Sequence, residues 1–131
     1  MSTKAKKKAP AASQVWFEIP ADKTGRAQKF YTSLFGWKIS PIPGMENYSH
    51  IDTGGADASP DGAVMGRMHP GHTFTPYLLV PSVTRAMKRV KKLGGKICKP
   101  KTPVPRMGYF AVCQDTEKNV FALWEMNQKA K

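Results

Sequence analysis

Glu18 and His50 lie in expected strands, and their side chains are of types that suit acid and base chemistry. Glu18 lies in the stretch 14–19, where apolar and polar residues alternate as in a strand that buries one face. A carboxyl group and an imidazole that converge on a substrate can exchange protons with it near neutral pH. Each also has a plainer interpretation, a strand-end carboxylate paired with a surface lysine and a half-exposed strand histidine.

Aromatic and neutral polar residues are expected on the same inward face as Glu18 and His50. Such a lining suits the stacking of a planar or apolar small molecule that hydroxyl and amide groups hold in place. The same aromatic residues could equally be plain core. The expected ligand-binding residues are Gln14, Trp16, Tyr48, Thr75, Tyr77, Tyr109 and Trp124, and Cys113 is expected beside them.

Two further features invite a chemical role that the sequence does not support. His69 and His72 have a His-x-x-His spacing, but they flank Pro70 and Gly71, and no cysteine or carboxylate lies close in sequence to complete a zinc site. Cys113 has no assigned base, and burial is the commoner role of such a cysteine. We therefore expect neither a zinc site nor a cysteine nucleophile.

The elements that position these residues occur twice along the chain. In the stretch 14–39 a strand ends at Pro20, Asp22 and Thr24 offer side-chain oxygens for a helix start, and Gly36 stops the helix. A second strand and helix begin at Pro76. The apolar stripe of the first helix is Ala27, Phe30, Tyr31 and Leu34, and that of the second is Val83, Ala86, Met87, Val90 and Leu93.

Three strands are expected after each helix. They cover 37–42, 48–52 and 63–68 in the first half, and 96–101, 109–114 and 120–126 in the second. The fold class is therefore α+β, with two βαβββ modules at about 14–68 and 74–127. Two such sheets would form one domain over 14–127 with a concave shared cavity and with the helices outside.

Length and cysteine content bound the class of protein. The chain has 131 residues and two cysteines, which fits one domain without a disulfide framework. It shows neither a signal-peptide pattern nor a long apolar span, so we expect a cytoplasmic protein with no membrane partner. Residues 1–13 hold four lysines and are expected to be a disordered basic tail, and residues 128–131 a second tail.

The charge is strongly positive, with a formal net charge of +12. From Arg85 to Arg106 there are nine positive residues and no acidic one. A solvated face that keeps the protein soluble explains this pattern, and contact with nucleic acid or another polyanion is the weaker alternative. Because aromatic residues do not interleave with the charges, a nucleic-acid partner is not expected.

Three stretches carry a resemblance to a known family. They are FEIPAD and FYTSLFGW in the first half and GYFAVCQDTEKNVFALWEM at the end. The sequence over 14–127 resembles the vicinal oxygen chelate superfamily, which includes glyoxalase I, bleomycin and fosfomycin resistance proteins and extradiol dioxygenases. The branch described as related to lactoylglutathione lyase is the most similar. The resemblance implies a homodimer and a divalent metal held by the first and last strands of each half.

The four positions that the resemblance assigns to metal ligands are poor in donors. They are Gln14, Val64, Thr75 and Ala122, and a register shifted by two gives Trp16, Gly66, Tyr77 and Trp124. A divalent ion needs several converging nitrogen or oxygen donors, and only Gln14 readily supplies one. We expect no metal and no other cofactor.

Two classes of function remain open at this stage. The first is a metal-free binder of a small molecule, of the resistance-protein type. The second is a lyase, isomerase or dioxygenase that uses Gln14, Glu18 and His50. Contact with a polyanion through the basic helix is a third and weaker possibility, and the sequence does not decide whether the protein is an enzyme.

Overall fold

The computed structural model describes residues 12–55 and 60–131. Contacts within the chain divide it into two compact units, which we call the N-terminal unit (Gln14–Tyr77) and the C-terminal unit (Leu78–Lys131). Ser13 belongs with the C-terminal unit, where its carbonyl accepts a hydrogen bond of 3.0 Å from the backbone N–H of Leu79. Most of the expected basic tail and part of the loop after β3 lie outside the described residues.

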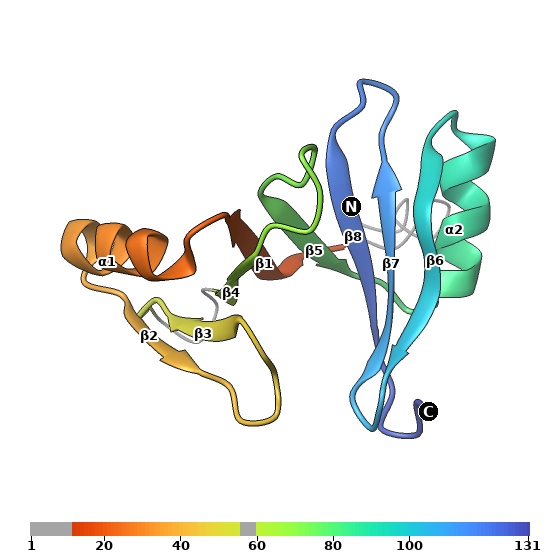
Figure 1. Ribbon diagram of the computed structural model, residues 1–131. Coiled ribbons are helices and arrows are strands. Elements are labelled where there is room, and N and C mark those ends of the chain that lie inside the picture. Colours follow the sequence, from red (N-terminus) through yellow and green to blue (C-terminus); the bar gives the residue numbers. More distant parts are fainter. Residues whose placement is uncertain (1–11, 56–59) are drawn as a thin grey trace, which may run out of the picture. The chain divides into compact units, whose positions relative to one another are not determined.

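The N-terminal unit contains one helix and a mixed sheet (Figure 1). Its elements are β1 (Gln14–Ala21), α1 (Thr24–Phe35), β2 (Lys38–Pro41), β3 (Tyr48–Asp52), β4 (Asp61–Gly66) and the start of β5 (Thr75–Leu79). The strand order is β2-β3-β4-β1, and β5 follows β1. Strands β1 and β4 run parallel, whereas β4 pairs antiparallel with β3, and β3 with β2.

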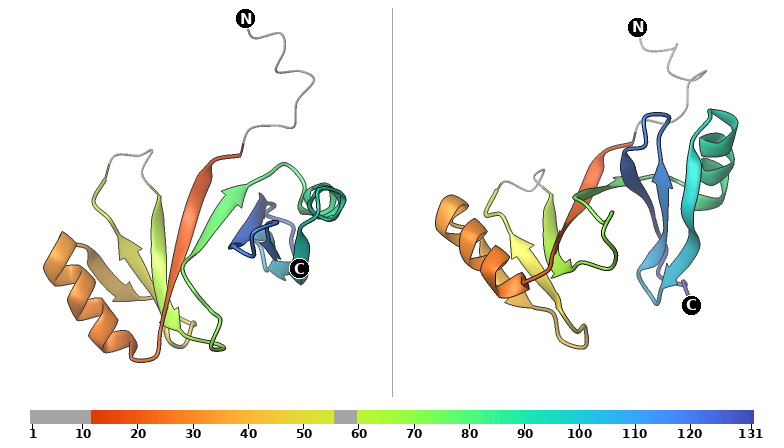
Figure 2. Two further views of the ribbon diagram at one scale, coloured as in Figure 1. Left: turned by 90° about the horizontal axis from the view of Figure 1, so that it is seen from above. Right: turned by 45° about the horizontal axis from the view of Figure 1, so that its top comes forward.

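The C-terminal unit repeats the order of helix and strands. After the end of β5 it contains α2 (Val83–Lys92), β6 (Lys96–Val104), β7 (Gly108–Gln114) and β8 (Val120–Met126). These three strands form an antiparallel sheet in the order β8-β7-β6, with α2 lying along it in both views of Figure 2. The predicted α+β fold with two βαβββ modules is confirmed.

The core of the N-terminal unit lies between its sheet and α1. Ile19, Ile51 and Val64 are at most 3% exposed, and partly buried residues of β1, α1 and β2 surround them. The predicted helix stripe is right for Ala27 and Tyr31, which pack on this cluster. The prediction is wrong for the other two stripe residues, because the sheet covers only part of the apolar face that the spacing defines. Those residues are Phe30 and Leu34, which are 59% and 58% exposed.

The ends of α1 differ in how well the sequence predicts them. Gly36 ends the helix with a φ of 73°, and its N–H donates to the Thr32 carbonyl at 2.9 Å. The start is not capped by a side chain, contrary to expectation. Asp22 instead pairs with Arg67 Nε at 2.9 Å, and the Thr24 hydroxyl donates to Asn47 at 3.0 Å.

The core of the C-terminal unit lies between its sheet and α2. Val83, Ala111, Cys113 and Leu123 are the buried residues of this cluster, and the predicted stripe residues Ala86, Met87 and Val90 pack against them. Ser82 caps the helix by accepting the Arg85 N–H at 3.1 Å. Leu93 was predicted in the stripe but is 66% exposed, because the helix ends one residue before it.

The two helices of the described residues are short, at 12 and 10 residues. Neither is long and apolar enough to cross a membrane.

Candidate functional site

A hydrogen-bonded group of four side chains lies on the face of the N-terminal sheet away from α1. Both oxygens of the Glu18 carboxyl group accept hydrogen bonds from tyrosine hydroxyls, Tyr48 at 2.8 Å and Tyr77 at 3.0 Å. The indole N–H of Trp16 donates to the Tyr48 hydroxyl at 2.9 Å. We call these four residues the Glu18 group, and they come from β1, β3 and β5.

The sequence separates these residues widely, and the sheet brings them together. Trp16 and Glu18 are two apart on β1 and so share a face, opposite to Phe17 and Ile19, which pack in the α1 core. Tyr48 reaches Glu18 across β4, since Glu18 pairs with Ala63 and Tyr48 pairs two residues further along that strand. The alternation that the sequence predicts for β1 is therefore the one observed.

Burial sets the ionisation of the Glu18 group. Removal from water raises the pKa of Glu18 above its ordinary value near 4.5, and the hydrogen bonds from Tyr48 and Tyr77 oppose part of that rise. Burial also raises the pKa of both tyrosines well above their usual range, and the nearby Glu18 charge adds to this effect. The tyrosines thus stay protonated as donors, and Glu18 is the member that can exchange a proton.

His50 forms a second pair beside this group. Its Nε2 lies 3.2 Å from Asp61 Oδ2, and its ring lies 5.8 Å from that of Trp16. The backbone N–H of Thr53 donates to the other oxygen of Asp61 at 3.2 Å, which fixes the carboxylate. This arrangement can orient an imidazole for proton transfer.

Glu18 and His50 were expected to form an acid/base pair if they converge. The structure gives them separate partners, but both are register neighbours of Ala63, on opposite sides of β4. Two strand spacings separate their backbones, about 10 Å. Both side chains lie on the face away from α1, with the fully buried Ala63 between them.

The remaining predicted residues of the N-terminal unit lie at the edges of this face. Gln14 is exposed at the first position of β1. Thr75 is 3% exposed, and its hydroxyl donates to the Thr73 carbonyl at 2.8 Å. Neither belongs to the Glu18 group.

Tyr109 and Cys113 lie elsewhere than expected. Both pack in the α2-side core of the C-terminal unit, and Trp124 is paired with Phe110 and so points to the opposite face. The expectation of one shared inward face is therefore wrong for these two residues. Burial also raises the pKa of the Cys113 thiol to about 11, with a smaller effect of Cys98, so the nucleophilic thiolate is scarce at neutral pH.

His69 and His72 stack with ring centroids 5.4 Å apart in a turn. The Met68 backbone N–H donates to His72 Nδ1 at 3.1 Å, which leaves the ring proton of the neutral form on Nε2. Burial, followed by His69 and Arg67, lowers the pKa of His72. This tautomer does not favour a metal ion on either nitrogen of His72.

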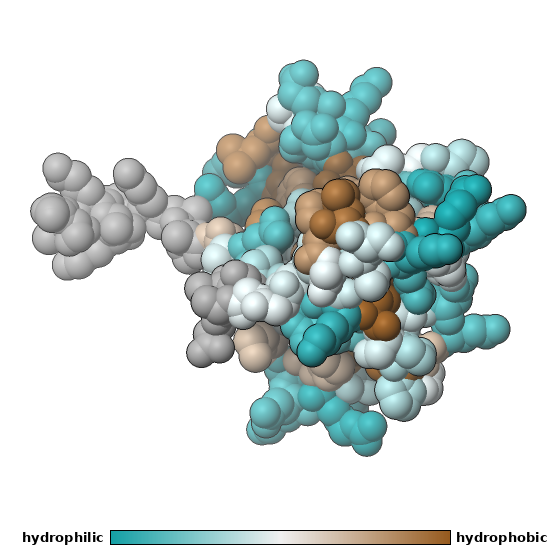
Figure 3. Space-filling model, turned by 90° about the vertical axis from the view of Figure 1, so that its left-hand side faces the viewer, coloured by the Kyte–Doolittle hydropathy of each residue, from teal (hydrophilic) through white to brown (hydrophobic). Residues whose placement is uncertain are grey.

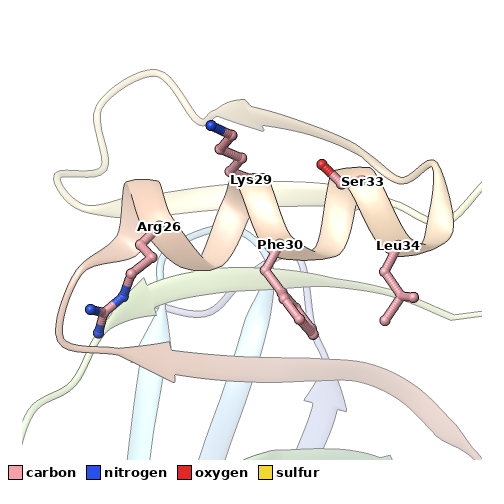
Figure 4. A pocket seen from close by; sticks show the side chains of 5 residues that line it. All are labelled: Arg26, Lys29, Phe30, Ser33 and Leu34. Carbon is pink, nitrogen blue, oxygen red and sulfur yellow. The ribbon is translucent and has the colours of Figure 1, made fainter.

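An open hollow lies on α1, and the sequence analysis did not predict it. Figure 4 shows Arg26, Phe30 and Leu34 projecting from one side of the helix, and Lys29 and Ser33 from the other. Figure 3, which looks at the molecule from the α1 side, shows apolar groups reaching the surface among polar ones. Because its side chains diverge, this hollow offers fewer converging polar groups than the Glu18 group does.

Comparisons with known proteins point to one superfamily. The family model for the bleomycin resistance protein-like N-terminal region matches residues 14–54, which covers β1 to β3. A glyoxylase-like domain-containing protein of Didymella fabae is 33% identical over 112 residues, covering 81% of this chain and 88% of that protein. The chain belongs to the vicinal oxygen chelate superfamily.

Longer relatives and solved structures agree with this assignment. A Mycobacterium tuberculosis protein named as a glyoxylase is 28% identical over 121 residues, covering 86% of this chain. The chain spans less than half of that relative's length, 45%. A glyoxalase/bleomycin resistance protein/dioxygenase superfamily member from Vibrio splendidus has the same fold, with a TM-score of 0.65 at 13% identity over 88% of this chain and 99% of that one.

The metal positions of the superfamily do not fit a divalent ion here. Val64 lies in the α1-side core, and its side chain has no donor atom. The Thr75 hydroxyl donates a hydrogen bond to the Thr73 backbone carbonyl, and the side chain of Ala122 has no atom that could bind a metal. Among residues 12–55 and 60–131, no three His, Cys, Asp or Glu side chains gather as a metal site would require. The donor set thus disagrees with the metal that the family implies, and the metal-free state remains a prediction.

The stretch from Asp115 to Asn119, which is part of the family resemblance, forms a turn that its own hydrogen bonds hold. Asp115 accepts the backbone N–H groups of Glu117 at 2.7 Å and Asn119 at 2.9 Å, and the Asn119 side chain donates to its other oxygen at 3.0 Å. These bonds, chiefly those from Asn119, lower the pKa of Asp115. They hold the turn between β7 and β8 and indicate no reaction.

Asp61 is the site residue that sequence analysis missed. It lies at the end of a turn-rich stretch, and the strand was expected to begin two residues later. Extending the alternation of β4 backwards from Ala63 would have placed Asp61 on the same face as His50.

Proposed function

We propose that this protein binds a planar or apolar small molecule on the N-terminal sheet face, without a metal. The observation that carries the proposal is the Glu18 group, in which Trp16, Tyr48 and Tyr77 surround a partly buried carboxyl group. Aromatic side chains supply stacking area, and Glu18 can accept a hydrogen bond from the ligand or, when protonated, donate one.

Two further considerations support binding. The superfamily contains resistance proteins as well as enzymes, and this donor set does not fit the metal of the enzymes. A relative that is 27% identical over 131 residues is named as an anthracycline biosynthesis protein of Streptomyces peucetius. Anthracyclines are planar polycyclic compounds, which is the shape that an aromatic face accommodates.

The experiment is a titration with daunorubicin as the probe, read by the probe's own fluorescence. Trp16→Phe should weaken binding by roughly tenfold, because it removes the indole that both stacks and positions Tyr48. Trp37→Phe is the matched control, because Trp37 packs in the α1-side core of the same unit, and it should leave binding unchanged. Equal loss in both variants, or none in either, would refute the proposed site.

The second candidate function is enzymatic, and the His50–Asp61 pair favours it. With His50 as base and Glu18 as acid on either side of Ala63, the face could move a proton within a bound substrate, as lyases and isomerases do. The test is turnover of the hemithioacetal of methylglyoxal and glutathione by metal-stripped protein. Activity that His50→Gln and Glu18→Gln each abolish would support catalysis, and its absence would leave binding as the function.

We also propose a homodimer, as expected from the superfamily. The exposure of Phe30, Leu34 and Phe35 on α1 supports it, since each is more than half exposed in the single chain. Sedimentation equilibrium at micromolar concentration should give twice the mass of the chain. A monomer would contradict this proposal.

A further inference from the structure

Positive charge is divided unequally between the two units. Residues 14–77 hold five Lys and Arg against six Asp and Glu, whereas residues 78–131 hold twelve against three. The formal charges are therefore −1 and +9. Solubility requires a net charge but does not require that one unit carry nearly all of it.

Helix α2 concentrates this charge on its outer side. Val83 is fully buried, and Ala86, Met87 and Val90 pack on the sheet. The opposite side carries five exposed cations: Arg85, Lys88, Arg89, Lys91 and Lys92. The ion pairs of the described residues, His50–Asp61 and Arg67–Asp22, both lie in the N-terminal unit, so none of these cations has an ion-pair partner there. The Glu125 carboxylate at the start of α2 accepts the Val83 backbone N–H at 2.9 Å instead.

Lys101 of β6 extends this surface beyond the helix. Its Nζ donates to the Thr84 hydroxyl at 3.2 Å and lies 4.3 Å from the centre of the Tyr109 ring. These contacts hold the ammonium group at the flank of α2. We call Lys101 and the five helix cations the basic face.

We propose that the basic face binds the phosphate backbone of a nucleic-acid duplex without sequence preference. Arg85, Lys88, Arg89 and Lys92 are spaced i, i+3, i+4, i+7, so they form one row of charges about 5–6 Å apart. Such a row can contact successive phosphates and release counterions from them. Sequence alone favoured solvation, because it did not show that these cations lack ion-pair partners in the fold.

Two other polyanions fit the surface less well. A helix that binds a membrane inserts its apolar side among the lipids, and the apolar side of α2 is covered by its own sheet. Single-stranded nucleic acid is held by bases stacked on exposed aromatic rings, and Lys101 covers the Tyr109 ring. The phosphates of a duplex require neither insertion nor stacking.

The test measures binding of the full chain to a fluorescein-labelled 24-base-pair duplex by anisotropy, over a series of salt concentrations. Lys88→Gln/Lys92→Gln removes two neighbouring cations of the row. The expected result is roughly tenfold or greater weakening at 0.1 M salt, and a slope of log affinity against log salt that is shallower by about 2. Lys88→Arg/Lys92→Arg should restore binding.

The matched control is Arg26→Gln/Lys29→Gln on α1, which removes the same charge from the other unit. It should change duplex affinity by less than about twofold. Equal weakening in both double variants would overturn the proposal, because net charge alone would then explain binding. Absence of duplex binding at 0.05 M salt would also overturn the proposal. So would a protein that binds phosphatidylserine vesicles but not the duplex, if that vesicle binding depends on Lys88 and Lys92.

Discussion

The two units share one architecture and differ in what their sheets carry. In the N-terminal unit the face away from the helix holds Glu18 with its tyrosine donors and the His50–Asp61 pair. In the C-terminal unit Tyr109 and Cys113 turn into the core, and the charge gathers on the outside of α2. The repeated fold thus places the helices and strands in the same way in both units. The side chains on the sheet face of one unit and on the outer side of the helix of the other can still differ and suit different partners.

The shared architecture predicts equal costs for equivalent core truncations, and these are the largest effects expected. Ile51→Ala and Leu123→Ala should each lower the free energy of unfolding by about 2–5 kcal/mol, because both side chains are at most 4% exposed. Leu93→Ala should cost less than about 1 kcal/mol, because its side chain is 66% exposed and α2 ends before it. Urea denaturation checks all three, and a large cost at Leu93 would contradict its place outside the core.

The glycines after the two helices should respond less strongly and unequally. Gly36 and Gly94 have φ values of 73° and 94°, so an alanine at either site strains the backbone by about 1 kcal/mol. A Cβ on Gly94 would also lie 3.3 Å from Thr116 Cγ2, whereas one on Gly36 meets nothing within 4 Å. Gly94→Ala should therefore lower the melting temperature more than Gly36→Ala does, and the reverse order would contradict the description of these turns.

The Glu18 group predicts a pH dependence of stability opposite in sign to that of Asp115 in the C-terminal unit, because the pKa of Glu18 is raised and that of Asp115 is lowered. Because folding raises the pKa of Glu18, its contribution to stability is complete below about pH 4.5 and is lost as pH rises through the folded-state pKa. Glu18→Gln removes this loss, so the variant should gain stability relative to the parent between pH 4.5 and 8. Melting temperatures measured across this pH range check the difference, with Glu46→Gln, at an exposed residue, as the control. If the melting temperatures of Glu18→Gln and of the parent change with pH in parallel, the pKa of Glu18 is not raised.

Metal removal should have the smallest effect of all. Protein purified without a histidine tag should contain well under one Zn, Ni, Mn or Fe per chain, and EDTA should leave its melting temperature unchanged. The reason is the poor donor set at Gln14, Val64, Thr75 and Ala122. Stoichiometric metal that is lost in Gln14→Ala would restore the glyoxalase-like enzyme as the leading function.

Local patterns predicted much of the fold. The bounds of the strands at 48–52 and 120–126 and the glycine stop at Gly36 follow from alternation and from turn residues. The face of β7 could not be predicted in this way. Its residues from Tyr109 to Cys113 are all apolar, so the period of two gives no contrast between inward and outward sides.

The sequence predicted which residues belong to the candidate site better than it predicted the hydrogen bonds that join them. Trp16, Glu18, Tyr48, His50 and Tyr77 were all selected from the sequence. Their hydrogen bonds join residues 30 and 59 positions apart, and these depend on the parallel pairing of β1 with β4 and on the place of β5 beside β1. Local periodicity carries no information on such pairings.

The central claim is that ligand chemistry resides on the N-terminal sheet face and needs no metal. Chemical-shift mapping of the ¹⁵N-labelled, EDTA-treated protein during a daunorubicin titration tests it most directly. The expected result is that the largest shifts fall on the amides of Trp16 to Glu18, Tyr48 to His50, and Ala63. Shifts concentrated in β7 and β8 or along α1, or shifts that occur only after metal is added, would contradict the account.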